Sequence, residues 1–260
     1  MSDRALAGSI EVQVQGAVAR VVVNHAARFN AMTRSMWRQL AQVFAELGAR
    51  ADLRCVVLQG QGDHFCAGGD ISEYPSFRFN ESTLREFHEN EVWGGLQAIL
   101  SCDVPVVASI RGNCMGAGVE LASCCDLRLA SDSARFGAPI GKLGFPMAPR
   151  EAQLVATRVG DGLARAMLLG AQVLSAQRLL ESGFLLQTCA PDDLEQHTDA
   201  LVQTVLSLGP QAARLNKQTL RALTAAEPSA PLLASAYDYA DSPEHQEGVG
   251  AFVDKRRPVF

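Results

Sequence analysis

The sequence lacks the patterns that mark several common classes of protein. Basic residues do not outnumber acidic ones, because 23 Lys and Arg stand against 28 Asp and Glu for a net charge of −5. The chain therefore has no electrostatic footprint for nucleic acid. No apolar run approaches the roughly 18 residues of a membrane span, and the N-terminus has no basic stretch followed by an apolar one. We expect a cytoplasmic protein with neither a membrane nor a nucleic-acid partner.

Cysteine and histidine are present, but not in the patterns of metal sites or disulfide frameworks. The seven cysteines form no C-x-x-C pair and their number is odd, and the five histidines include no H-E-x-x-H pair. Several cysteines lie in apolar runs, where a free thiol behaves as a small hydrophobic side chain. We expect a reducing compartment, no disulfide framework and no metal.

Motifs for nucleotide binding and for serine hydrolysis are also missing. No G-K-[ST] follows a glycine-rich segment, the G-x-G-x-x-G spacing is absent, and no G-x-S-x-G occurs. These absences remove sequence support for a P-loop, a dinucleotide fold and a serine nucleophile.

Two glycine-rich segments are the most informative part of the chain. Residues 64–70 read HFCAGGD and residues 112–121 read GNCMGAGVEL, and each follows a short β-type run. Small residues at a strand-to-helix turn let backbone N–H groups approach a ligand closely. Two such turns on neighbouring strands could aim two N–H donors at one oxygen, as in an oxyanion hole. A tight turn without a ligand, as in any α/β protein, is the open alternative.

Glu120 lies near the end of the second glycine segment, within a predicted apolar helix. A carboxylate buried there is costly without a partner or a function, so Glu120 is a candidate acid or base. A solvated position on the outer helix face is the alternative. Cys66 and Cys114 would need a neighbouring histidine to act as nucleophiles. The sequence does not bring His64 or His88 to them, so we interpret both thiols as packing side chains.

Predicted strands and helices alternate through the first half of the chain. The expected strands are residues 10–14, 18–23, 55–58, 106–110 and 127–130. The expected helices are residues 33–47, capped by Thr33, then 81–100, and a helix ending near 124. This alternation favours helices packed on a mainly parallel sheet. Beyond about residue 148 the expected elements are an extended stretch at 185–189 and helices over 192–208, 211–224 and 231–240.

Five segments, taken in order, carry a family pattern. They are residues 24–32 (NHAARFNAM), 65–71 (FCAGGDI), 112–126 (GNCMGAGVELASCCD), 174–177 (LSAQ) and the tail from 245 to 260. The tail contains EG, AF, KR, P and F at the spacing E-G-x-x-A-F-x-x-K-R-x-P-x-F. Together these segments resemble the enoyl-CoA hydratase/isomerase family, also called the crotonase superfamily.

The resemblance implies a fold, a substrate class and a set of site residues. The fold would be α/β, a crotonase-like spiral of β/α units over residues 1–195 with a helical C-terminal part over 196–260 that builds trimers or dimers of trimers. The substrate would be an acyl-CoA thioester, with coenzyme A as part of the substrate and no other cofactor. By matched position, the N–H groups of Gly69 and Ala117 would form an oxyanion hole and Glu120 would be catalytic. The positions matched to CoA binding are Ala27, Arg28, Phe29, Ala67, Asp70, Phe252 and Lys255.

One departure from the family pattern bears on the reaction. Residues 137–140 read GAPI, so Ile140 stands where the family's hydratases carry a second glutamate. Isoleucine cannot transfer a proton, and Ile140 would instead line the acyl pocket. Three acidic residues of other segments could replace the glutamate, although the sequence does not locate their side chains: Glu89, Glu91 and Glu151.

Three functional hypotheses follow from this pattern. The first is a hydratase that adds water to a 2-enoyl-CoA, or removes it from a 3-hydroxyacyl-CoA, through a thioester enolate. The second is an enoyl-CoA double-bond isomerase in which Glu120 is the single acid/base. The third is an acyl-CoA-binding protein without hydratase activity.

Overall fold

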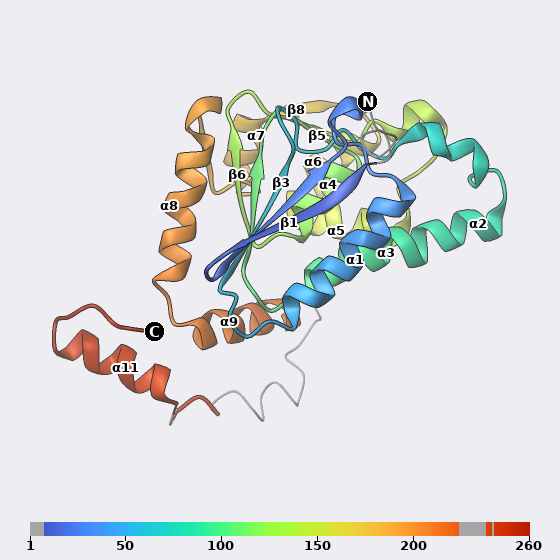
Figure 1. Ribbon diagram of the computed structural model, residues 1–260. Coiled ribbons are helices and arrows are strands. Elements are labelled where there is room, and N and C mark those ends of the chain that lie inside the picture. Colours follow the sequence, from blue (N-terminus) through green and yellow to red (C-terminus); the bar gives the residue numbers. More distant parts are fainter. Residues whose placement is uncertain (1–7, 224–237, 241) are drawn as a thin grey trace.

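The computed structural model describes residues 8–223, 238–240 and 242–260 (Figure 1). Its main sheet has the strand order β1-β2-β3-β4-β6-β9. These strands are β1 (Ser9–Gln15), β2 (Val18–Asn24), β3 (Cys55–Gly60), β4 (Val106–Ile110), β6 (Leu127–Ser131) and β9 (Gln187–Cys189). β1 and β2 form an antiparallel hairpin, and the other neighbours pair in parallel. The predicted α/β class with a mainly parallel sheet is confirmed.

Both faces of this sheet are covered, because successive side chains of a strand point to opposite sides. Val56 and Leu58 of β3 belong to the large hydrophobic core, whereas Cys55 and Val57 pack in a second cluster with α8 (Leu194–Leu206). Figure 1 shows α8 on one side of the sheet and α1 (Arg34–Gly48) on the other. Burial on both faces explains why β3 and β4 read as continuous apolar runs.

The first helix forms as its sequence predicts. The hydroxyl oxygen of Thr33 accepts a hydrogen bond from the N–H of Met36 and caps the first turn. The buried side chains recur at helical spacing: Met36, Trp37, Leu40, Phe44 and Leu47. This apolar stripe packs α1 against α3 (Trp93–Ser101) and β1.

The helix expected over residues 81–100 is interrupted. It consists of α2 (Glu81–Glu86), a π-helical segment (Phe87–Val92) and α3. A π-helical segment shifts the register of side chains along a helix and is often found at functional sites. Here it brings Phe87, His88 and Val92 to the wall of one cavity.

A second, small sheet was not predicted from the sequence. It contains β5 (Asn113–Met115), β7 (Arg135–Gly137) and β8 (Val173–Ser175). Strands of three residues are too short to show an alternating pattern. The second glycine segment is therefore not a direct strand-to-helix turn, because β5 lies between β4 and α4 (Ala117–Cys124).

Helices dominate the second half of the chain. They include α5 (Pro149–Val159), α6 (Asp161–Leu168), α7 (Ala176–Glu181), α9 (Pro210–Ala222) and α11 (Pro243–Val253). Lys217 of α9 forms an ion pair of 2.6 Å with Asp126, which fastens α9 to the core. Most of the helix expected over 231–240 lies outside the described residues, and 238–240 form a turn, while α11 was not predicted. The division of the chain at residue 195 stays a prediction.

None of the helices within the described ranges combines the length and the apolar character needed to cross a membrane.

Candidate active site

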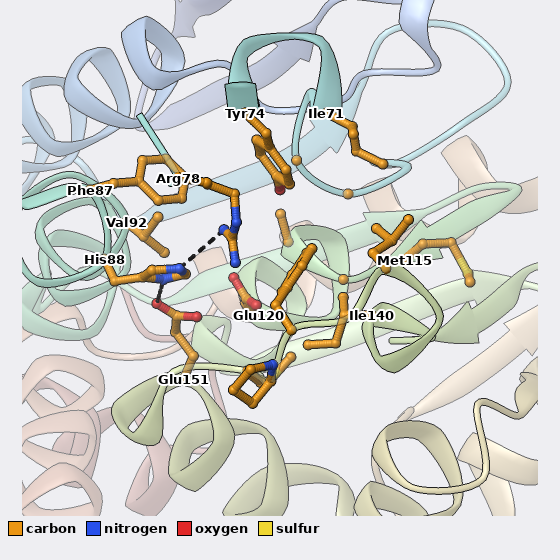
Figure 2. A pocket seen from close by; sticks show the side chains of 18 of the residues that line it. Ile71, Tyr74, Arg78, Phe87, His88, Val92, Met115, Glu120, Ile140 and Glu151 are labelled. Carbon is orange, nitrogen blue, oxygen red and sulfur yellow. Dashed lines mark hydrogen bonds and ion pairs between the residues drawn. The ribbon is translucent and has the colours of Figure 1, made fainter. Parts of the chain in front are cut away.

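A cavity of about 340 Å³ lies between the two glycine segments, the residues 71–92 and the start of α5. Its wall is largely apolar, and the main contributors are Trp37, Ile71, Phe87, Val92, Ile140 and Phe145. The ionisable or polar side chains around it are Tyr74, Arg78, His88, Glu120, Lys142 and Glu151. Ile140 lies in the wall of this cavity, which Glu120 also lines (Figure 2).

The two glycine segments are joined by backbone hydrogen bonds. The N–H of Cys66 donates to the carbonyl of Asn113 and the N–H of Met115 donates to the carbonyl of Cys66, both at 2.9 Å. Gly118 allows α4 to approach this bridge, since a Cβ atom there would lie 2.5 Å from the Cys66 carbonyl oxygen. The two turns are therefore neighbours in space, as their position after adjacent strands predicts.

Gly69 and Ala117 both line the cavity, and neither backbone N–H donates a hydrogen bond to another backbone group of the described residues. Around Gly69, the carbonyl of Gly68 accepts from Met32 and the N–H of Asp70 donates to Met32, both at 2.8 Å. In a parallel bridge of this kind the N–H of the intervening residue, here Gly69, points away from the partner residue Met32. Ala117 is the first residue of α4, so its N–H has no acceptor within the helix.

Glu120 points into the cavity from the first turn of α4 and is only 7 % exposed. Within the described part of the chain its carboxyl group has no hydrogen-bond partner. Burial raises the pKa of Glu120 well above its ordinary value, and the nearby Glu151 carboxylate raises it further. The solvated alternative for Glu120 is wrong, and its buried position favours the neutral, protonated form of the carboxyl group.

Of the three acidic residues that could replace the missing glutamate, only Glu151 lines the cavity. Glu91 is bound by Arg34 and Arg38 at 2.7 and 2.6 Å, and Glu89 pairs with Arg150 at 3.3 Å. A sequence signal for Glu151 existed but was missed. It lies in the first turn of α5 on the same buried face as Leu154, Val155 and Val159.

His88 links Glu151 to Arg78 across one side of the cavity (Figure 2). Its Nδ1 lies 2.8 Å from Oε1 of Glu151 and its Nε2 lies 3.3 Å from Nη1 of Arg78. A guanidinium group can only donate, so Nε2 is the acceptor and Nδ1 carries the proton that is donated to Glu151. Sequence reasoning named His88 only as a partner for a cysteine and missed Arg78 and Tyr74.

The cysteines of the glycine segments are packing residues. Cys66 and Cys114 are fully buried, and burial raises the pKa of Cys66 to about 12 and that of Cys114 well above its ordinary value. Thiols of this kind are poor nucleophiles at neutral pH. His64 is occupied elsewhere, because its Nδ1 accepts from the N–H of Asn113 at 3.1 Å. In the described segments no three His, Cys, Asp or Glu side chains gather as metal ligands.

The positions matched to CoA binding fall into two groups. Ala27 and Arg28 lie in an exposed 3-10 turn (Ala26–Arg28) beside the first glycine segment, where the N–H of Ala67 donates to the carbonyl of Phe29 at 3.0 Å. The Asp70 carboxylate caps the 3-10 helix Ile71–Ser76 by accepting from the N–H of Ser72 at 3.0 Å.

The second group lies at the C-terminus. Phe252 on α11 is 86 % exposed, and Lys255 just after α11 is exposed as well. Neither residue lines the cavity of its own chain.

Comparison with known proteins gives one consistent result. The family model described as enoyl-CoA hydratase/isomerase matches residues 13–260. A short-chain-enoyl-CoA hydratase of Clostridium acetobutylicum is 28% identical over 253 residues, covering 96% of both chains. A probable enoyl-CoA hydratase of Mycobacterium bovis is 28% identical over 255 residues, covering 97% of both. The crystal structure of an enoyl-CoA hydratase/carnithine racemase from Magnetospirillum magneticum superposes with a TM-score of 0.93 at 32% identity, covering 96% of this chain and 94% of that one.

Proposed function

The chain belongs to the enoyl-CoA hydratase/isomerase (crotonase) family and has its fold, and from this premise we propose that it is an enoyl-CoA hydratase-type lyase. In this proposal it adds water to a 2-enoyl-CoA or removes water from a 3-hydroxyacyl-CoA. Relatives that carry the name enoyl-CoA hydratase support this substrate class.

One observation carries the proposal. Two carboxyl groups, those of Glu120 and Glu151, face the same cavity that Gly69 and Ala117 line with their backbone. Glu151 thereby compensates for the isoleucine at position 140. The two environments differ, because Glu151 accepts a hydrogen bond from His88, whereas Glu120 has no hydrogen-bond partner among the described residues and its pKa is raised well above the ordinary value. A proton donor and a proton acceptor in one site are what hydration of a double bond requires.

In the proposed mechanism the thioester oxygen accepts hydrogen bonds from the N–H groups of Gly69 and Ala117. These donors, together with the positive end of the α4 dipole, stabilise the enolate that forms when water attacks C3. The Glu151 carboxylate takes one proton from the attacking water, and the neutral Glu120 gives one proton to C2. The product carries hydroxyl at C3 and hydrogen at C2, and a return of the proton from Glu151 to Glu120 restores the site.

Coenzyme A itself would bind along the exposed turn at 26–29 and the first glycine segment. The backbone at Ala27, Arg28, Phe29, Ala67 and Asp70 would hold its nucleotide. We further propose a homotrimer or a dimer of trimers. The exposure of Phe252 and Lys255, outside the cavity of their own chain, supports a role at the CoA site of a neighbouring subunit.

A double-bond isomerase is the second candidate, and a specific contact favours it. Because Glu151 is already engaged by His88, Glu120 is the one carboxyl of the pair without a hydrogen-bond partner. Moving a proton between C2 and C4 needs only one such group. An acyl-CoA-binding protein without turnover is the third possibility.

Loss of the enoyl-thioester absorbance of crotonyl-CoA, measured at high enzyme concentration, tests these candidates. A hydratase converts crotonyl-CoA to 3-hydroxybutyryl-CoA, which mass spectrometry identifies by the gain of one water. An isomerase leaves crotonyl-CoA unhydrated but forms it from 3-butenoyl-CoA. Failure of both reactions with binding of butyryl-CoA retained would contradict the enzymatic proposal and leave a binding protein.

A further inference from the structure

Arg78 is a cation in the wall of this largely apolar cavity. It follows the 3-10 helix Ile71–Ser76 and is partly buried. Its guanidinium carbon lies 3.7 Å from the ring centre of Phe145 and 4.7 Å from that of Tyr74. Its one hydrogen-bond contact among the described residues is the imidazole of His88, and it forms no ion pair with a carboxylate there.

Two other arginines that are partly or largely buried have several acceptors for their N–H groups. Arg34 makes a two-pronged ion pair with Glu91, both distances being 2.7 Å. Arg128, which lies over the ring of Phe184, donates to the backbone carbonyls of residues 122, 125, 126 and 184. An arginine has five N–H donors, and a buried cation without acceptors is costly. Arg78 therefore has guanidinium N–H groups that can donate hydrogen bonds to a molecule inside the cavity.

The position of Arg78 indicates which part of a ligand it would meet. Figure 2 shows its guanidinium group on the same side of the cavity as Glu120, His88 and Glu151, where the reaction is proposed to occur. Of the positions matched to the CoA nucleotide, Ala27, Arg28 and Phe29 lie at the exposed turn 26–29, and only Ala67 lines the cavity. An anion at Arg78 thus belongs to the acyl part and not to a phosphate.

We infer that the substrate's acyl group ends in a carboxylate, so that the chain takes the CoA thioester of a dicarboxylic acid and Arg78 binds the distal carboxylate. This inference rests on the proposed function and specifies its substrate class. The guanidinium packs against the rings of Phe145 and Tyr74, which lie edge to face, and its N–H groups that bind no described acceptor can form a two-pronged hydrogen bond, a geometry that a carboxylate matches. The cation would also offset repulsion between that carboxylate and Glu151.

Binding of saturated thioesters tests the inference without requiring turnover. Titration calorimetry would compare glutaryl-CoA with pentanoyl-CoA, and adipyl-CoA with hexanoyl-CoA, so that each pair has one acyl length. In at least one pair we expect the dicarboxylic thioester to bind at least about tenfold more tightly than the monocarboxylic one. A charge-assisted pair of hydrogen bonds provides a difference of this size. Equal or weaker binding of both dicarboxylic thioesters would overturn the inference.

Variants connect the preference to the side chain. Arg78→Met should abolish the preference with little change in pentanoyl-CoA binding, and Arg78→Lys should keep part of it. Arg150→Met is the matched control, because Arg150 is a neighbouring surface arginine that does not line the cavity. A preference that survives in Arg78→Met would contradict the assignment. Absence of binding by all four thioesters would instead refute the acyl-CoA site itself, and the inference with it.

Discussion

Nδ1 of His88 donates a hydrogen bond to the Glu151 carboxylate at 2.8 Å, and this contact distinguishes the two carboxyl groups of the cavity. Glu120 receives no such bond, is buried, and faces the charge of Glu151. The two carboxyl groups of the cavity thus have different surroundings: that of Glu151 accepts a hydrogen bond from His88, whereas that of Glu120 is buried with its pKa raised.

Replacement of Glu151 should change the pH dependence of the reaction as well as its rate. If neutral Glu120 is the proton donor, activity declines as the pH rises through its raised pKa. Glu151→Gln removes the like charge that contributes to this shift, so the pKa of Glu120 falls and the declining limb moves to lower pH. Profiles of kcat/KM against pH for crotonyl-CoA measure the displacement.

The matched control for this experiment is Glu89→Gln. Glu89 is close in sequence to His88 but pairs with Arg150 outside the cavity, so its profile should equal that of the unaltered enzyme. A Glu151→Gln profile with an unmoved limb would show that the two carboxyl groups are not coupled.

Glu120→Gln should separate catalysis from binding. The amide keeps the size of the side chain but cannot transfer a proton, so we expect kcat to fall by about 10²–10⁴-fold. Binding of butyryl-CoA, measured by calorimetry, should stay within a factor of about three, because a neutral amide replaces a neutral acid. Unchanged turnover in this variant would exclude Glu120 from proton transfer.

The same substitution should alter stability in a pH-dependent way. Folding raises the pKa of Glu120, so between its ordinary and its raised value the native state holds a proton that the unfolded chain releases. The free energy of unfolding therefore falls as the pH rises through this window, by up to about 1.4 kcal/mol per pH unit. Glu120→Gln removes this loss.

Urea denaturation at pH 5, 6, 7 and 8 would measure the difference between the two proteins. We expect the stability of Glu120→Gln relative to the unaltered chain to increase steadily with pH. A difference that is constant across this range would mean that Glu120 titrates normally in the folded protein.

Much of the site could be predicted from sequence because it is local. The glycine segments follow adjacent parallel strands, so their proximity follows from the strand order alone. Glu120 lies about one turn after Gly116 of the second segment, and its apolar neighbours made it a candidate acid or base but left a solvated position open. Thr33 and the apolar stripe of α1 likewise define a helix without any tertiary information.

The remainder of the site depends on contacts between distant segments. Glu151 and His88 are 63 residues apart in the chain, and their approach depends on the packing of α5 against α4 and on the π-helical segment. The sequence of residues 81–100 has the period of an ordinary helix, so its hydrophobic pattern does not indicate the change of register at Phe87. Arg78 lies between two regular elements, where no periodicity indicates the direction of a side chain.

The close approach of Gly118 to the Cys66 carbonyl gives a test of how the two glycine segments are held together. In Gly118→Ala the new Cβ would lie 2.5 Å from that backbone oxygen, which cannot move without breaking the bridge to Met115. We expect a loss of about 1–3 kcal/mol in the free energy of unfolding, despite the better helix propensity of alanine. Because the strain also separates Gly69 from Ala117, kcat for crotonyl-CoA should fall.

Gly94→Ala serves as the control for Gly118→Ala, since Gly94 is also helical but has no atom within 4 Å of a built Cβ. There alanine should increase stability by about 0.5–1 kcal/mol and leave kcat unchanged, because only helix propensity changes. Equal stability of the two variants would mean that α4 can shift away from Cys66 at little cost. The distance between the N–H groups of Gly69 and Ala117 would then not depend on Gly118, and the role of Gly118 would be limited to the turn.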